Sequence, residues 1–137
     1  EYSTFIDILQ PTEYNLTYLF QAGFVEGYGK IIKDFCKGYF VAWEQRKRIY
    51  CWKGEWEVFT EEDLSTIVSK LQKKVMNLYS KWTQSHRANS MHFNKYMAMI
   101  LGGESSERKK KNKMIYLNLW ESLKKDFHRE TEYQITF

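Results

Sequence analysis

Three short segments rich in aromatic residues constrain the fold more than any other feature of this chain. Residues 39–43, 49–52 and 56–59 carry the bulky apolar side chains typical of strands, and two polar segments, 44–48 and 53–55, separate them. Such short connections predict an antiparallel meander. Because a sheet of two or three short strands is only marginally stable in water, it has to pack against helices. The chain is therefore predicted to be α+β.

A long helix is predicted directly after the third strand. Thr60 is a suitable N-cap, and the acids that follow it, Glu61, Glu62 and Asp63, match the positive end of a helix dipole. Apolar residues then recur at helical spacing from residue 64 to residue 82, the longest regular signal in the chain.

The same periodicity predicts three more helices. The first is capped by Thr12 or Asn15 and stops at Gly27-Tyr28-Gly29. The second carries apolar residues between 93 and 101 and ends at two glycines, and the third covers residues 116–127.

The predicted architecture is an N-terminal helix, a three-stranded antiparallel meander and then three packed helices. Residues 104–113 are interpreted as a charged loop, and residues 133–137 as the beginning of a strand or linker. A length of 137 residues is typical of one domain, with a core expected between residues 12 and 128. The chain starts without Met and ends on an apolar, strand-like sequence, so we expect it to be a piece of a longer protein.

Neither a membrane protein nor a secreted protein is predicted. No apolar run approaches the roughly 20 residues that cross a bilayer, and no signal-peptide pattern opens the chain. The two cysteines, Cys36 and Cys51, are interpreted as buried thiols, which fits a reducing compartment. A soluble, intracellular protein of the cytoplasm or nucleus is expected.

No catalytic residue, metal site or cofactor is predicted. The GxxxxGK[ST] pattern of a phosphate-binding loop is absent, and the short Gly27–Lys30 segment lacks its spacing. The histidines, His86, His92 and His128, have no HExxH spacing, and no CxxC pair is present. The acids at 61–63 are interpreted as helix-capping residues rather than as a general acid and base.

Two basic clusters are the candidate binding residues. The chain has 21 Lys and Arg against 17 Asp and Glu, a formal charge of +4, so an anionic partner is one interpretation. Clusters in one groove could contact several phosphates of single-stranded or forked DNA, whereas solvated loops are the plain alternative. Nearby aromatic rings could stack on bases, but no ring is assigned because one sheet face must be core. The candidate residues are Arg46, Lys47, Arg48, Arg108, Lys109, Lys110, Lys111 and Lys113.

The first half of the chain resembles a known family. A helix segment with Leu19, Ala22 and Phe24 precedes Tyr28-Gly29, and the strands lead to the segment 50–56, Tyr-Cys-Trp-Lys-Gly-Glu-Trp, before a capped helix. This order resembles the domain that precedes the superfamily-3 helicase in poxvirus-type primase-helicases and in related phage and plasmid primases. The resemblance implies a non-catalytic accessory domain, viral or from a mobile element, that binds DNA or assembles the helicase ring with neighbouring domains or copies. The Lys-rich segment 108–113 has no place in that pattern.

Two other functions remain open at this point. The chain could be a protein-interaction module whose exposed aromatic residues dock a partner and whose basic loops only maintain solubility. It could also be a small enzyme with a site assembled from distant residues, in which case Cys36 or Cys51 should be unusually reactive.

Overall fold

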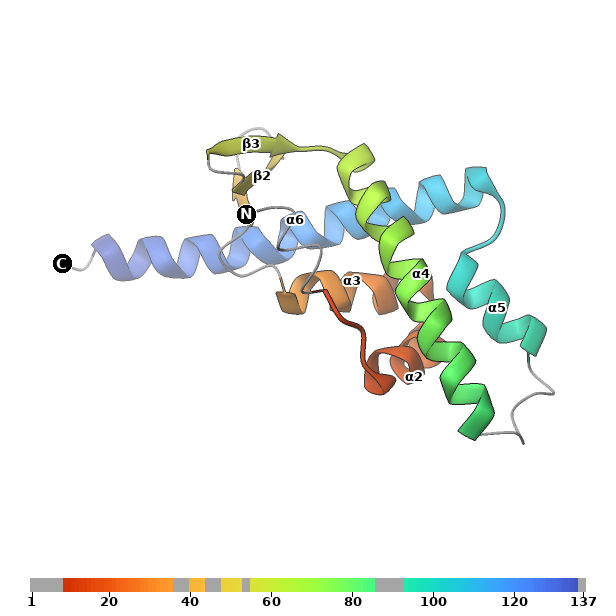
Figure 1. Ribbon diagram of the computed structural model, residues 1–137. Helices are drawn as coiled ribbons and strands as arrows, with labels where there is room; N and C mark the ends of the chain where they lie inside the picture. The colour runs from red at the N-terminus through yellow and green to blue at the C-terminus, as the bar shows by residue number, and fades with distance from the viewer. Residues whose placement is uncertain (1–8, 36–39, 44–47, 53–54, 86–92, 136–137) are drawn as a thin grey trace.

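A computed structural model describes residues 9–35, 40–43, 48–52, 55–85 and 93–135 of the chain. It confirms the predicted α+β class: helices, then a three-stranded antiparallel sheet, then three helices (Figure 1). In order, the described elements are α2 (Glu13–Ala22), α3 (Phe24–Phe35), β1 (Phe40–Trp43), β2 (Arg48–Trp52), β3 (Trp56–Phe59), α4 (Glu61–Ser85), α5 (Phe93–Leu101) and α6 (Ser105–Ile135).

The sheet is the predicted meander, with strand order β1-β2-β3. Ile49 of β2 lies opposite Phe59 of β3, and Trp52 lies opposite Trp56. Since side chains alternate between the two faces of a strand, this register sends Ile49, Cys51 and Phe59 into the core, where none of them is exposed. The other face carries Trp52 and Trp56 toward solvent.

Helix α4 begins where the sequence predicted, and its first turn is held by a reciprocal capping box. The backbone N–H of Thr60 donates to Asp63 Oδ2 at 2.9 Å, and the N–H of Asp63 donates to Thr60 Oγ1 at 3.1 Å. Both bonds satisfy donors that a helix N-terminus would otherwise leave without partners. Glu61 and Glu62 occupy the same turn and remain exposed.

The prediction of one N-terminal helix that stops at Gly27-Tyr28-Gly29 is wrong. The chain instead breaks at Gly23, which has a φ of 94° and separates α2 from α3. A positive φ is readily adopted only by glycine, so this residue allows the chain to turn. Gly27 then lies inside α3 against Leu19 of α2, where the lack of a side chain permits close packing of the two helices.

The interpretation of residues 104–113 as a loop is also wrong, because α6 starts at Ser105. Gly102 and Gly103, with φ of 79° and 86°, end α5 and reverse the chain before it. Lysine and arginine are good helix formers, but the first turns of α6 are almost entirely exposed and so show no apolar periodicity. The helix also continues to Ile135, which replaces the strand or linker expected from Tyr133 onward.

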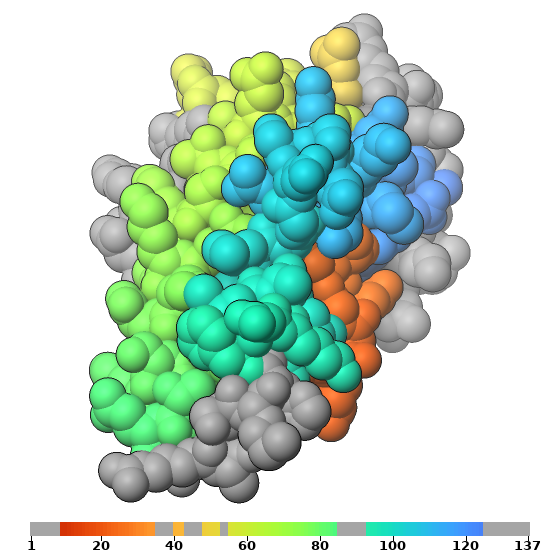
Figure 2. All heavy atoms as spheres, turned by 90° about the vertical axis from the view of Figure 1, so that its right-hand side faces the viewer, coloured from red at the N-terminus to blue at the C-terminus, as the bar shows by residue number. Residues whose placement is uncertain are grey.

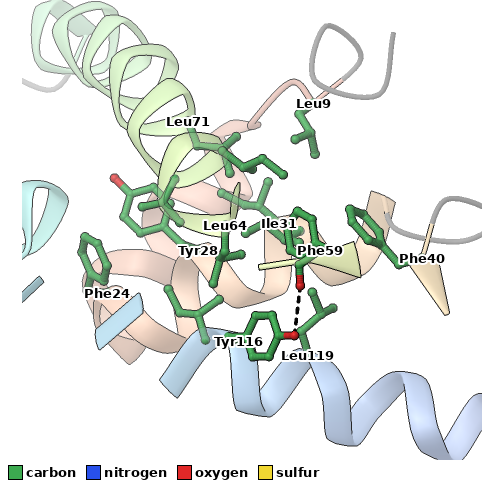
Figure 3. Packing of buried hydrophobic residues seen from close by; sticks show 14 of the residues in the cluster. Leu9, Phe24, Tyr28, Ile31, Phe40, Phe59, Leu64, Leu71, Tyr116 and Leu119 are labelled. Carbon is green, nitrogen blue, oxygen red and sulfur yellow. Dashed lines mark hydrogen bonds between the residues drawn. The ribbon is translucent and has the colours of Figure 1, made fainter. Parts of the chain in front are cut away.

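Helix α6 connects the two halves of the core. It contacts α3, α4 and β1, and Figure 1 shows the sheet above it with α2 and α3 below. The Tyr116 hydroxyl accepts a hydrogen bond from the N–H of Ile49 at 3.3 Å. It donates one to the carbonyl of Phe59 at 3.0 Å, drawn as the dashed line in Figure 3. One hydroxyl therefore ties α6 to two paired residues of neighbouring strands.

Candidate nucleic-acid interface

A groove between α4 and α6 is the concave feature that brings the most polar and charged side chains of two helices together, with Phe24 of α3 beside them. Its volume is about 690 Å³, within the range of small-molecule and cofactor sites. Figure 2 faces this end of the molecule, with α4 in green and the start of α6 in cyan. Phe24 of α3 and Val68 contribute apolar surface. The remaining lining residues are polar or charged: Thr60, Glu61, Glu62, Ser65, Ser69, Gln72, Ser105, Arg108, Lys109 and Asn112.

The two walls of the groove carry opposite charge. Arg108 and Lys109 belong to α6, and Glu61 and Glu62 belong to the first turn of α4. All four side chains are exposed, and none of them makes an ion pair with another described residue. A phosphate entering the groove would be attracted to the α6 wall and repelled by the α4 carboxylates.

Hydroxyl and amide groups lie between these charges. The Asn112 side chain donates from Nδ2 to Ser65 Oγ at 3.4 Å, which links the two walls. The other amide atom, Asn112 Oδ1, is buried and has no hydrogen-bond partner among the described residues. Asn112 therefore joins the two walls through its Nδ2 atom, and the acceptor capacity of its Oδ1 atom is not used by a described residue.

Lys111 has a structural contact that its neighbours lack. Its Nζ donates to the carbonyl of Gly102 at 3.0 Å and lies 5.7 Å from the centre of the Phe24 ring. The same corner leaves no room for a side chain at Gly102, since an added Cβ would lie 2.6 Å from that ring. Lys111 therefore links the α5–α6 turn to α3. Lys110 and Lys113 are exposed but do not line the groove.

Of the first basic cluster, only Arg48 lies in the part of the chain that the structure describes. Arg48, predicted to lie in a turn, is the first residue of β2 and is exposed, but it does not line the α4–α6 groove. Arg46 and Lys47 lie outside the described residues. Tyr116, which contacts β2 at Ile49, is eight residues after Arg108, or about 12 Å along the helix. Arg48 is thus near the groove without lining it.

Sequence reasoning missed the polar α4 wall. Glu61, Ser65 and Ser69 follow one another at intervals of four, so they form a row along one side of α4. Thr60 and Gln72 line the groove at the two ends of this row. The available signal is a row of polar side chains beside the apolar face of a helix. Helix capping alone accounts for Glu61, the first residue of this row, and so hides the row.

Burial raises the pKa of Tyr28, Tyr79 and Tyr116, and none of these residues lines the groove. Cys51 is confirmed as a buried thiol, while Cys36 and the three histidine side chains fall outside the description. Across the described ranges, no group of three His, Cys, Asp or Glu residues could hold a metal ion.

Comparisons with protein-family models, with curated proteins and with solved structures found no match. Of the helices whose residues are described, none combines the length and apolar character needed to span a membrane.

Proposed function

We propose that this chain is a non-catalytic nucleic-acid-binding module that holds the phosphates of single-stranded or forked DNA on the α6 wall of the α4–α6 groove. The observation that carries the proposal is the position of Arg108 and Lys109. Both are exposed, both line the groove, and neither is neutralised by an ion pair with a described residue. Charge-assisted hydrogen bonds from such groups are among the strong contacts to phosphate.

The polar lining supports the same ligand. Ser65, Ser105 and Asn112 supply hydrogen-bond donors beside the two cations, and such groups commonly contact phosphate and sugar oxygens. The carboxylates of Glu61 and Glu62 confine phosphate to the opposite wall. If this is correct, E61Q/E62Q should bind an oligonucleotide more tightly than the unchanged chain.

The replication context comes from the resemblance of residues 17–72 to the domain before superfamily-3 helicases. We propose on that basis that the module guides DNA, or contacts neighbouring domains or copies, within a primase-helicase. The parent reading frame tests this half independently. A P-loop encoded within about a hundred residues after Phe137, roughly one domain length, would support it, and a parent frame without one would remove it.

The DNA-binding half is tested by fluorescence anisotropy. A labelled oligothymidylate of about 16 nucleotides covers the known range of site sizes for single-strand binding folds. Its affinity would be measured between about 50 and 200 mM NaCl for R108Q/K109Q and for K70Q/K73Q. The second pair is the matched control, because Lys70 and Lys73 are also exposed cations but lie on α4 outside the groove.

R108Q/K109Q should weaken binding and make the log–log salt slope shallower by about 1.4, since each lost phosphate contact contributes about 0.7 on a single strand. K70Q/K73Q should change the slope much less. Equal losses in both pairs would mean that only net charge matters. Absence of salt-dependent binding by the unchanged chain would contradict the proposal outright. Lys111 is left unchanged, because its contact with Gly102 makes it part of the fold.

A protein-interaction surface is the second candidate, and one observation favours it. Met114 and Leu117 lie three residues apart on α6 and are 54% and 44% exposed, so they form one apolar patch. A partner domain or a second copy would cover it. Sedimentation of M114E/L117E against the unchanged chain tests this: self-association that the double variant loses, together with no salt-dependent DNA binding by the unchanged chain, would favour the second candidate.

A further inference from the structure

The outer face of the sheet carries aromatic side chains, and several of its described residues are exposed. Tyr50 and Trp52 of β2 and Trp56 and Val58 of β3 point away from the core residues on the opposite face. Trp52 is 40% exposed, Trp56 48% and Val58 40%. A sheet of this size needs only one apolar face for its core. These exposed side chains are therefore surplus to what folding requires and form a candidate contact surface.

The two tryptophans form a ring pair that leaves aromatic surface available. They are cross-strand neighbours, their ring centres are 5.3 Å apart and their planes meet at 63°. In an edge-to-face pair, one ring presents only its edge to the other. This arrangement leaves ring faces that the pair itself does not cover, and close to half of each residue is exposed. A flat nucleobase can stack on such a face whatever its sequence.

This aromatic face leads directly to the α4–α6 groove. Trp56 and Val58 are two residues apart and lie on the same side of β3. The chain then reaches Thr60, which lines the groove. At about 3.3 Å per residue, Trp56 and Thr60 are about 13 Å apart. At the other end of β2 from Trp52 is Arg48, an exposed cation on the same face of the strand. The ring pair thus lies at one end of this sheet face, and Arg48 lies at the other end, where the chain leaves β3 and enters the groove lining at Thr60.

We infer that this outer face stacks the unpaired bases of a single strand whose phosphates contact Arg108 and Lys109. The inference rests on the proposed function and narrows its ligand. In a duplex the bases are stacked inside and only their edges are accessible in the grooves, so Trp52 and Trp56 could not reach a base face. A single strand can use the rings and the cations together. The surface therefore selects single-stranded over duplex DNA.

The test compares two ligands and two variants. The ligands are oligothymidylate of about 16 nucleotides and a backbone of equal length in which every position is abasic. The variants are W52L/W56L and, as matched control, F93L, since Phe93 of α5 is 49% exposed but lies far from the sheet in the sequence. Thermal unfolding of each variant shows whether the fold is retained, and exposed positions should tolerate leucine.

The unchanged chain should bind oligothymidylate at least about tenfold more tightly than the abasic backbone, and W52L/W56L should lose most of this difference. F93L should keep it. The salt slope of W52L/W56L should match that of the unchanged chain, because no phosphate contact is removed. Equal affinity of the unchanged chain for both ligands, or full retention of the difference in W52L/W56L, would overturn the inference.

The two proposals fail in different ways. If R108Q/K109Q reduces the salt slope but W52L/W56L binds normally, phosphate binding in the groove is supported and base stacking on the sheet is rejected. If W52L/W56L loses base-dependent affinity while R108Q/K109Q binds normally, base stacking on the sheet is supported and phosphate binding in the groove is rejected. If W52L/W56L changes only self-association, the sheet face is a protein contact and the inference is wrong.

Discussion

Two glycines in α3, only two residues apart, should respond in opposite directions to the same substitution. Gly27 lies against α2: a Cβ added there would clash with the Leu19 side chain and lie 2.9 Å from Leu19 Cα. Gly29 has no atom within 4 Å of an added Cβ. Both lie inside the helix and neither has a positive φ. Alanine is thus sterically free at Gly29 and obstructed at Gly27.

The magnitudes follow from two opposing effects. Replacing glycine by alanine inside a helix raises the free energy of unfolding by about 0.5–1 kcal/mol. G29A should show this gain. G27A receives the same gain but also overpacks the α2–α3 contact, which typically costs about 1–3 kcal/mol. Since the obstruction at Gly27 includes backbone, the helices have to separate, and we expect a net loss of about 0.5–2 kcal/mol.

Urea unfolding followed by far-ultraviolet circular dichroism measures both variants against the unchanged chain. The midpoint should rise for G29A and fall for G27A, with the same slope in urea. If both substitutions stabilise the protein, α2 and α3 do not pack closely at Gly27. If both destabilise it, the segment ends a helix, as its sequence alone had suggested. The first result would refute the close packing at Gly27, and the second would refute the position of Gly29 inside α3.

Three further predictions concern tyrosine hydroxyls. Y116F leaves the N–H of Ile49 and the carbonyl of Phe59 without the hydroxyl that joins them, so the free energy of unfolding should fall by about 2 kcal/mol in urea denaturation; an unchanged value would contradict this bridge. The Tyr79 hydroxyl is buried without a hydrogen-bond partner among the described residues. Y79F should therefore raise the melting temperature, and a lower one would indicate a missed partner. Burial raises the pKa of Tyr28 above its ordinary value of 10.0, so the unfolded chain ionises first. The contribution of the Tyr28 hydroxyl to the free energy of unfolding is complete below pH 10 and is lost as the pH rises further. Y28F should therefore make the free energy of unfolding fall less steeply above pH 10, by up to about 1.4 kcal/mol per pH unit, in denaturation experiments at a series of pH values.

Local signals were enough to predict several elements. The three strands appear within one residue of their predicted bounds because aromatic segments alternated with short polar turns. Helix α4 was predictable from its cap and its long apolar face, and α5 from the glycines that end it. In each case the residues that decide the structure are neighbours in the sequence.

Local signals failed where distant contacts decide. A glycine can end a helix or allow close packing inside one, and only the position of Leu19 makes Gly27 a packing residue. The first turns of α6 carry charges on nearly every side, so no apolar period distinguishes helix from loop. Only the tertiary structure, in which Gly102 and Gly103 turn the chain before Ser105, shows that these residues are helical.

The amino-acid sequence by itself determined the class of fold, the order of the elements, and the candidate cations, because these follow from side-chain type and spacing. Tertiary structure alone decided which of the described cations line the groove. Ser65 and Asn112 are 47 positions apart and meet across the groove, so the packing of α4 on α6 selects Arg108 and Lys109 as lining residues and commits Lys111 to the fold. The same packing covers one face of the sheet and leaves Trp52 and Trp56 exposed on the other. A strand's alternation separates its two faces, but only the elements packed against it determine which face is buried.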